Sequence, residues 1–171
     1  MRTLFTIIIL LSFQGLTINA LFAQWVQMGN DIIGEQTDDW AGYSISLSSN
    51  SSIIAIGLPN NNGTGTDEGN VKVYSYNTGN WTQIGNDIYG QAVNELFGYS
   101  VSLNSKGTIL AVGIPYSDAI AGNSGCVRVY ELISGDWIQI GNDINGDTSN
   151  NMLGISVSLD STGSILAAGA T

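Results

Sequence analysis

The chain has 171 residues, a formal net charge of −10, one cysteine and no histidine, and 43% of its residues are hydrophobic. This length predicts about one domain, and the composition favours a globular, strand-rich protein over a disordered one. The acidic balance argues against nucleic-acid binding, because phosphate contacts need clustered Lys and Arg. A lone cysteine excludes an intrachain disulfide, and the lack of histidine excludes Ser/His/Asp, Cys/His and His-containing metal sites.

Residues 1–23 have the pattern of a secretory signal. Arg2 provides a positive start, residues 4–13 are apolar, and Ala23 ends the segment with a small side chain. An uncleaved membrane anchor is the alternative, but from Gln14 onward polar residues interrupt the apolar run before it reaches the ~20 residues that a span needs. We therefore expect cleavage after Ala23, no stable membrane span in the mature chain, and a secreted or cell-surface protein.

From residue 24 onward the sequence repeats with a period of 56 residues and needs no insertion or deletion. Three sets of residues that recur at this spacing are Trp25, Trp81 and Trp137; Gly42, Gly98 and Gly154; and Gly57, Gly113 and Gly169. Repeats of this length are typical of a supersecondary unit that needs neighbours to bury its faces.

Each repeat predicts four short antiparallel strands. In the second repeat, Tyr99, Val101 and Leu103 alternate with polar residues, and a turn at residues 104–107 leads to an apolar run at residues 108–112. No window after the signal segment has helical periodicity. Four strands per unit of ~40–50 residues is typical of a β-propeller blade. We therefore predict an all-β fold of four-stranded β-propeller blades.

The propeller region at residues 24–171 is predicted to contain an outer strand at 25–29, blade one at 41–86, blade two at 97–142 and a partial blade three at 153–171. The opening strand matches the fourth strand of a blade, which in a closed ring completes the last blade. The third repeat stops after its inner hairpin and leaves a strand edge that needs a neighbour. We expect a fragment of a larger propeller, with self-assembly of a short protein into a ring as the alternative.

The repeats resemble FG-GAP repeats, the blades of integrin-α-type β-propellers, as in secreted repeat proteins of bacterial type. The resemblance rests on Phe97-Gly98 and on two motifs of Gly-x-Pro type, Gly57-Leu58-Pro59 and Gly113-Ile114-Pro115. It implies an extracellular adhesion or protein-binding module. Many blades of this family carry a calcium loop of DxDxDG type, whose alternating oxygens suit a hard cation.

The loops at residues 60–69 and 116–125 lack that spacing of oxygen ligands. The first has three asparagines followed by Asp67-Glu68, and the second offers Asp118 almost alone. We interpret both loops as polar turns, with calcium binding as the alternative, and we predict no cofactor and no metal ligand.

Several residues are candidates for catalysis or ligand binding. Asp38-Asp39 is the nearest pair of carboxylates, but adjacent side chains point apart, which favours a solvated loop over an acid/base pair. Asp31, Asp87 and Asp143 recur in every repeat, which indicates turn formers that bind backbone groups rather than catalysts. Cys126 is interpreted as a small residue entering a strand rather than a thiol nucleophile.

The recurring tryptophans, Trp25, Trp81 and Trp137, are predicted to pack between blades, with stacking on sugar rings as the alternative. We therefore predict no catalytic residues. The predicted function is a module that binds an extracellular protein or glycan through loops that differ between repeats. The alternative is a scaffold or accessory domain of a larger secreted hydrolase or lyase whose catalytic part lies beyond residue 171.

Overall fold

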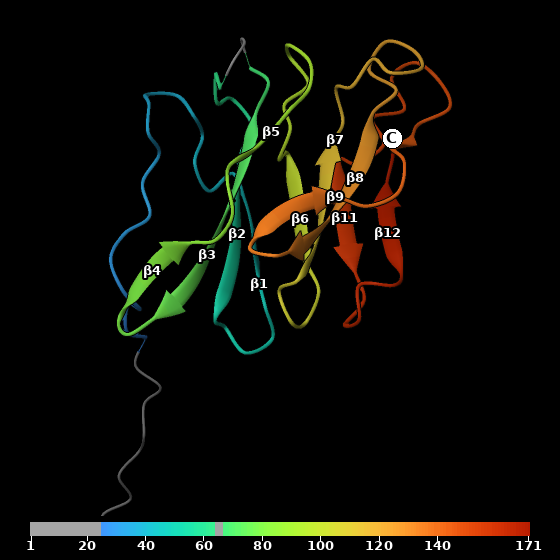
Figure 1. Ribbon diagram of the computed structural model, residues 1–171. Coiled ribbons are helices and arrows are strands. Elements are labelled where there is room, and N and C mark those ends of the chain that lie inside the picture. Colours follow the sequence, from blue (N-terminus) through green and yellow to red (C-terminus); the bar gives the residue numbers. More distant parts are fainter. Residues whose placement is uncertain (1–24, 64–66) are drawn as a thin grey trace, which may run out of the picture.

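The computed structural model describes residues 25–63 and 67–171, and every regular element in these residues is a β-strand (Figure 1). In chain order the strands are β1 (Ser44–Leu47), β2 (Ile53–Leu58), β3 (Asn70–Asn77), β4 (Asn80–Gln83), β5 (Ile88–Tyr89), β6 (Ser100–Leu103), β7 (Ile109–Ile114), β8 (Cys126–Ile133), β9 (Asp136–Gln139), β10 (Ile144–Asn145), β11 (Ser156–Leu159) and β12 (Leu166–Gly169). This confirms the predicted all-β fold. The predicted signal peptide, residues 1–23, lies outside the described residues.

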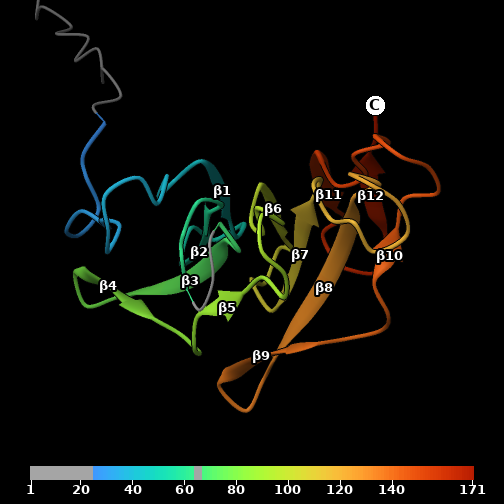
Figure 2. The ribbon, with the colours of Figure 1, turned by 90° about the horizontal axis from the view of Figure 1, so that it is seen from above.

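The strands form consecutive antiparallel blades of the β-propeller type. Blade one is a sheet in the order β1-β2-β3-β4, blade two has β6, β7, β8 and β9 paired in the same order, and blade three is the hairpin β11-β12. The first strands of successive blades contact one another, β1 with β6 and β6 with β11. Seen from above in Figure 2, these first strands lie side by side while β4 and β9 reach outward.

A short fifth strand in each complete blade was not predicted. β5 pairs with Asn70–Val71 of β3, and β10 pairs with the equivalent start of β8. These strands carry blade one to Tyr89 and blade two to Asn145, beyond the predicted ends at 86 and 142. The reason is that β3 is eight residues long and β4 pairs only with Tyr74–Asn77, so the edge at the start of β3 is open to a further segment.

The predicted outer strand at residues 25–29 is wrong as a strand. These residues have no regular structure, and Trp25 is 97% exposed. The equivalent β4 exists because it pairs with β3. Within the described residues, no third strand of a preceding blade stands beside residues 25–29, and a strand needs such a ladder partner.

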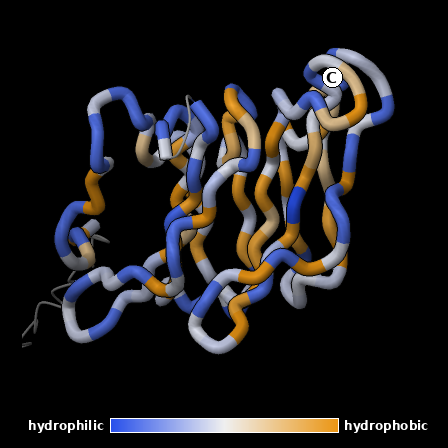
Figure 3. The backbone as a smooth tube through the Cα atoms, turned by 45° about the horizontal axis from the view of Figure 1, so that its top comes forward, coloured by the Kyte–Doolittle hydropathy of each residue, from blue (hydrophilic) through white to orange (hydrophobic). Residues whose placement is uncertain are grey.

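The core lies between the blades, where their apolar faces meet. Val101 and Leu103 of β6 are 8% and 7% exposed, and Leu110, Val112 and Ile114 of β7 are fully buried. Figure 3 shows the apolar residues concentrated along the strands and many polar residues in the loops at their ends. The alternating pattern of the sequence therefore turns its apolar side toward the neighbouring blade.

Glycine at one position of the second strand permits the close contact between blades. The hydroxyl of Ser44 donates to the carbonyl oxygen of Gly98 at 2.7 Å. A Cβ on Gly57 would lie 2.1 Å from that oxygen and 2.3 Å from Ser44 Oγ. A side chain at this position would therefore separate the two blades.

Candidate binding face

The variable loops gather at one end of the blades. Ser44 at the start of β1 pairs with Gly57 near the end of β2, so the segment entering β1 and the segment leaving β2 lie at the same end. Blade two repeats this with Ser100 and Gly113. We call this end, uppermost in Figure 1, the loop face; it comprises residues 34–43, 59–63, 67–69, 90–99, 115–125 and 146–155.

Four aromatic rings form a row on the loop face. Trp40 stacks on Tyr43 with ring centroids 5.7 Å apart, Tyr43 lies 4.9 Å from Tyr99, and Tyr99 lies 6.0 Å from Tyr116. Trp40 and Tyr43 are 49% and 48% exposed. The row therefore crosses from blade one to blade two, and its members are partly exposed to solvent.

The backbone before β1 holds Trp40 in place. Trp40 has φ 55°, in the left-handed region that bulky residues rarely adopt, and Tyr43 N–H donates to its carbonyl oxygen at 3.0 Å. The equivalents Leu96 and Met152 have φ 53° and 50°. Because all three blades share this conformation, it belongs to the scaffold, and only the side chain at this position changes from blade to blade.

Asp39 fixes the same loop from inside. Its Oδ2 accepts hydrogen bonds from the backbone N–H groups of Glu35 and Gln36, at 3.1 Å and 2.9 Å, and the residue is 2% exposed. Asp38 is exposed. The prediction of a solvated loop is therefore right for Asp38 and wrong for Asp39, whose buried carboxylate stabilises the loop through these two backbone hydrogen bonds.

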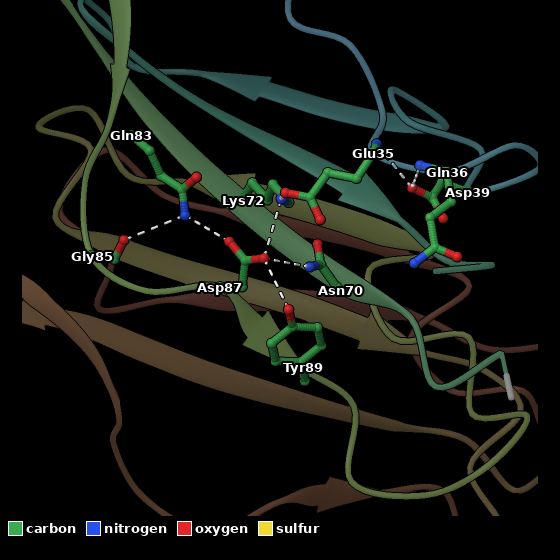
Figure 4. A network of polar contacts seen from close by, with 9 residues as sticks. All are labelled: Glu35, Gln36, Asp39, Asn70, Lys72, Gln83, Gly85, Asp87 and Tyr89. Atoms are coloured by element: carbon green, nitrogen blue, oxygen red, sulfur yellow. Dashed lines mark hydrogen bonds and ion pairs between the residues drawn. The ribbon is translucent and has the colours of Figure 1, made fainter. Parts of the chain in front are cut away.

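An ion network centred on the buried ammonium of Lys72 connects this loop to the sheet (Figure 4). The ammonium of Lys72, on β3, pairs with Glu35 and with Asp87, whose Oδ2 is 3.1 Å away. Burial alone lowers the pKa of Lys72, but its hydrogen bonds to Glu35 and Asp87 outweigh burial and raise that pKa. Three more side chains donate to Asp87: Gln83, Asn70 and Tyr89.

Blade two contains a corresponding network, with Arg128 in the place of Lys72. The guanidinium of Arg128 pairs with Glu95 Oε1 at 3.2 Å and with Asp143 Oδ2 at 2.9 Å. Glu95 also accepts from the backbone N–H groups of Gln91 and Ala92, as Asp39 does in blade one. The side chains of Arg128 and Glu95 are 4% and 7% exposed. Each network therefore ties a loop of the loop face to its own blade.

The recurring aspartates do not have the predicted role. Asp87 and Asp143 bind side chains of their own blade rather than backbone groups of a turn, and Gln139 donates to Asp143 at 2.7 Å as Gln83 does to Asp87. Asp31 accepts from Gln27 at 2.7 Å. The cationic partner lies 15 residues before the aspartate in the sequence, on β3 or β8, so local turn chemistry gave no sign of it.

The two loops compared with calcium loops are braced by their own side chains. Asn62 Oδ1 accepts from the backbone N–H of Asp67 at 2.9 Å, and Asp118 Oδ1 accepts from that of Asn123 at 2.6 Å. These bonds support the interpretation of both loops as polar turns. Within the described residues, no group of three or more Cys, Asp and Glu side chains is arranged to hold a metal ion.

Of the remaining candidates, Cys126, Trp81 and Trp137 have structural roles, and Trp25 does not. Cys126 begins β8 and is fully buried, and burial raises its pKa to about 11 although Arg128 acts in the opposite direction. Trp137 packs between blades as predicted, with 6% exposed. Trp81 Nε1 donates to the carbonyl of Met28 at 2.8 Å. Trp25 is the exception, since it is exposed to solvent instead of packing between blades.

The aromatic row was missed by the sequence analysis. Tyr43 and Tyr99 occupy the same repeat position, which a comparison of repeats could have found. Trp40 and Tyr116 have no aromatic equivalents in the other repeats of the printed sequence. Their place in the row depends on how the blades stack, so no spacing along the chain indicated it.

No family model and no curated protein sequence matches the chain. Among solved structures, that of U3-55K is similar over 74% of this chain and 34% of its own, with 18% identity and a TM-score of 0.45. The periplasmic gluconolactonase PpgL of Pseudomonas aeruginosa is similar over 74% and 36%, with 18% identity and a TM-score of 0.47. The chain thus spans about a third of each, and a likeness at this level indicates nothing about its activity. In residues 25–63 and 67–171, no helix is long and apolar enough to cross a membrane.

Proposed function

We propose that the chain is a β-propeller binding module that works outside the cell and recognises a neutral glycan or a protein through the loop face. The observation that carries this proposal is the aromatic row formed by Trp40, Tyr43, Tyr99 and Tyr116. Aromatic rings give large contact areas at low entropic cost and are enriched where binding energy concentrates. The proposed extracellular location rests on the signal pattern at residues 1–23.

The charges of the loop face favour an uncharged or protein partner over a polyanion. Lys72 and Arg128 are buried in their ion pairs, with side chains 6% and 4% exposed. Lys106 lies in the turn between β6 and β7, at the opposite end of the blade. Polyanions such as nucleic acids and sulfated glycans need exposed clustered cations, which the described part of the loop face does not offer.

The proposal includes the absence of catalysis by this chain alone. Asp38 is exposed and Asp39 is buried, and Asp87 and Asp143 form ion pairs with Lys72 and Arg128. The thiol of Cys126 is buried with a raised pKa, which makes a reactive thiolate unfavourable. These features support a scaffold that presents a surface.

The test is binding of the purified chain to arrayed neutral glycans, sulfated glycans and extracellular matrix proteins. We expect binding to at least one neutral glycan or protein probe, and at least a tenfold loss in Trp40→Ala and Tyr43→Ala. Trp25→Ala is the matched control, because Trp25 is 97% exposed and lies outside the loop face. Absence of binding to every such probe, or binding that both loop-face variants retain, would contradict the proposal.

A further inference from the structure

The sequence contains two Asn-Gly pairs, Asn62-Gly63 and Asn145-Gly146. An asparagine followed by glycine can lose its side-chain amide, because glycine has no side chain and lets its backbone nitrogen approach the amide carbon of the asparagine. The two pairs share this intrinsic chemistry, so the fold decides which of them reacts.

The pair Asn145-Gly146 is held by the sheet. Asn145 belongs to β10 and pairs with Cys126 of β8. The backbone N–H of Gly146 donates to the carbonyl oxygen of Gly125 at 2.9 Å, and a Cβ on Gly146 would lie 2.0 Å from the carbonyl oxygen of Ser124. The Gly146 nitrogen is thus fixed in a hydrogen bond, and it reaches the amide carbon of Asn145 only when this edge of the sheet opens.

The pair Asn62-Gly63 lacks these restraints. It follows β2 on the loop face, and both residues are exposed. Among the described residues, no hydrogen-bond acceptor holds the backbone N–H of Gly63 or the amide nitrogen of Asn62. The amide oxygen of Asn62 accepts from the backbone N–H of Asp67 at 2.9 Å. This bond stabilises negative charge that develops on the oxygen when the amide carbon is attacked, and it leaves the amide nitrogen free to depart.

The packing of Tyr89 explains why glycine stands at position 63. A Cβ on Gly63 would lie 2.3 Å from Cδ1 of Tyr89. The hydroxyl of Tyr89 donates to Asp87 at 3.0 Å, within the ion network of Figure 4, and this bond helps to fix the ring. Only glycine fits beside the ring, so the reactive pair is part of the way this loop packs.

We propose that Asn62 is a site of deamidation on the loop face, with water as the co-reactant. The backbone nitrogen of Gly63 loses its proton to solvent and forms a bond to Cγ of Asn62. The bond between Cγ and Nδ2 then breaks, and Nδ2 takes up a proton and leaves as ammonia. Water opens the resulting cyclic imide at either of its two carbonyl carbons, which leaves aspartate or isoaspartate at position 62.

The reaction changes both the charge and the geometry of the loop. It replaces a neutral amide by a carboxylate, while Lys72 and Arg128 in the described part of the loop face are already engaged in ion pairs. The isoaspartate product also lengthens the main chain by one methylene beside the ring of Tyr89, where a side chain has no room. An effect on partner binding would rest on the function proposed above, whereas the modification itself does not depend on it.

The experiment incubates the purified, folded chain in mildly alkaline buffer and follows both sites by mass spectrometry. Trypsin cleaves after Lys72 and Arg128 and so places the two Asn-Gly pairs in separate peptides. We expect Asn62 to convert at least tenfold faster than Asn145 in the folded chain. In guanidinium chloride the two sites should convert at rates within about threefold of each other, because the local sequence then dominates.

Two variants serve as controls. Asn62→Gln removes the reactive amide and should abolish the fast conversion in its peptide. Asn60→Gln changes a nearby asparagine that glycine does not follow, and it should leave that conversion unchanged. Circular dichroism checks that each chain stays folded during incubation. The proposal is overturned if Asn62 converts no faster than Asn145 in the folded chain, if the unfolded chain shows the same tenfold preference, or if Asn62→Gln retains the fast conversion.

Discussion

The indole N–H of Trp137, in β9, donates a hydrogen bond to the backbone carbonyl oxygen of Ile84 in the preceding blade at 3.1 Å. The ring lies against Gly85, where an added Cβ would be 2.7 Å from Trp137 Cδ1. Trp81 makes the same bond to Met28 at 2.8 Å. The recurring tryptophan therefore joins the outer edges of successive blades, while the serine bonds join the inner edges.

Replacement of Trp137 by alanine should destabilise the protein strongly. Trp137 is 6% exposed, and truncation of a buried aromatic side chain costs about 3–5 kcal/mol. Trp25→Ala should change stability by less than about 0.5 kcal/mol, because Trp25 is 97% exposed. Urea denaturation followed by circular dichroism checks both values. Equal losses of stability in the two variants would contradict the role of Trp137 in joining the blades.

Gly113→Ala should weaken the junction between blades two and three. Its Cβ would lie 2.0 Å from the carbonyl oxygen of Gly154, and overpacking of this kind costs about 1–3 kcal/mol. Gly122→Ala is the control, because no atom lies within 4 Å of the added Cβ. Hydrogen exchange should show faster exchange at the N–H of Leu159, which is bonded to Ser102. An unchanged exchange rate at Leu159 in Gly113→Ala would contradict this prediction.

The two ion networks predict unequal costs for loss of their glutamates. Glu95→Ala leaves Arg128, whose side chain is 4% exposed, without one buried partner, and breaking such a pair costs about 3–5 kcal/mol. Glu35 is 61% exposed, so Glu35→Ala should cost less than about 1 kcal/mol. The midpoints of chemical denaturation compare the two variants. A larger loss of stability in Glu35→Ala than in Glu95→Ala would contradict this prediction.

Asp160 gives blade three a pH dependence. Hydrogen bonds from the Thr162 hydroxyl and the Ile165 backbone N–H lower the pKa of Asp160 from 3.8 to about 2. The ionised carboxylate therefore stabilises the turn above about pH 4, and this contribution disappears as the pH falls toward 2.

Asp160→Asn tests this dependence. Asn104, at the equivalent position, accepts the same kind of backbone bonds, from the N–H groups of Thr108 and Ile109. The variant should therefore match the wild type in melting temperature at pH 7 and lose less of it between about pH 4 and pH 2. If the melting temperature of the variant falls as much as that of the wild type over that range, Asp160 is not the source of the pH dependence.

The sequence predicted the strands because their pattern is local. Tyr99, Val101 and Leu103 alternate with polar residues and form or adjoin β6, and the glycines at 57 and 113 mark the close contacts between blades. It did not predict β5 and β10, since two-residue strands have no pattern of their own and form only because an edge of β3 or β8 is open.

The candidate site was harder to predict from the sequence, because it depends on contacts between segments that are distant along the chain. Lys72 meets Glu35 across 37 positions, and Arg128 meets Glu95 across 33. Tyr43 and Tyr99 come within 4.9 Å only because their blades stack. The sequence predicted a binding site in the loops that differ between repeats, but which side chains these loops bring together depends on the packing of the blades.

The proposal that the loop face binds the partner is tested most directly by the indole N–H signals of the four tryptophans in a ¹H–¹⁵N correlation spectrum. The chain is titrated with a neutral glycan or protein that binds it on the arrays. We predict that the Trp40 signal shifts in proportion to binding, while the signals of Trp81 and Trp137 stay in place. Saturable binding that shifts Trp81 or Trp137 and leaves Trp40 unchanged would place the site elsewhere and contradict the account.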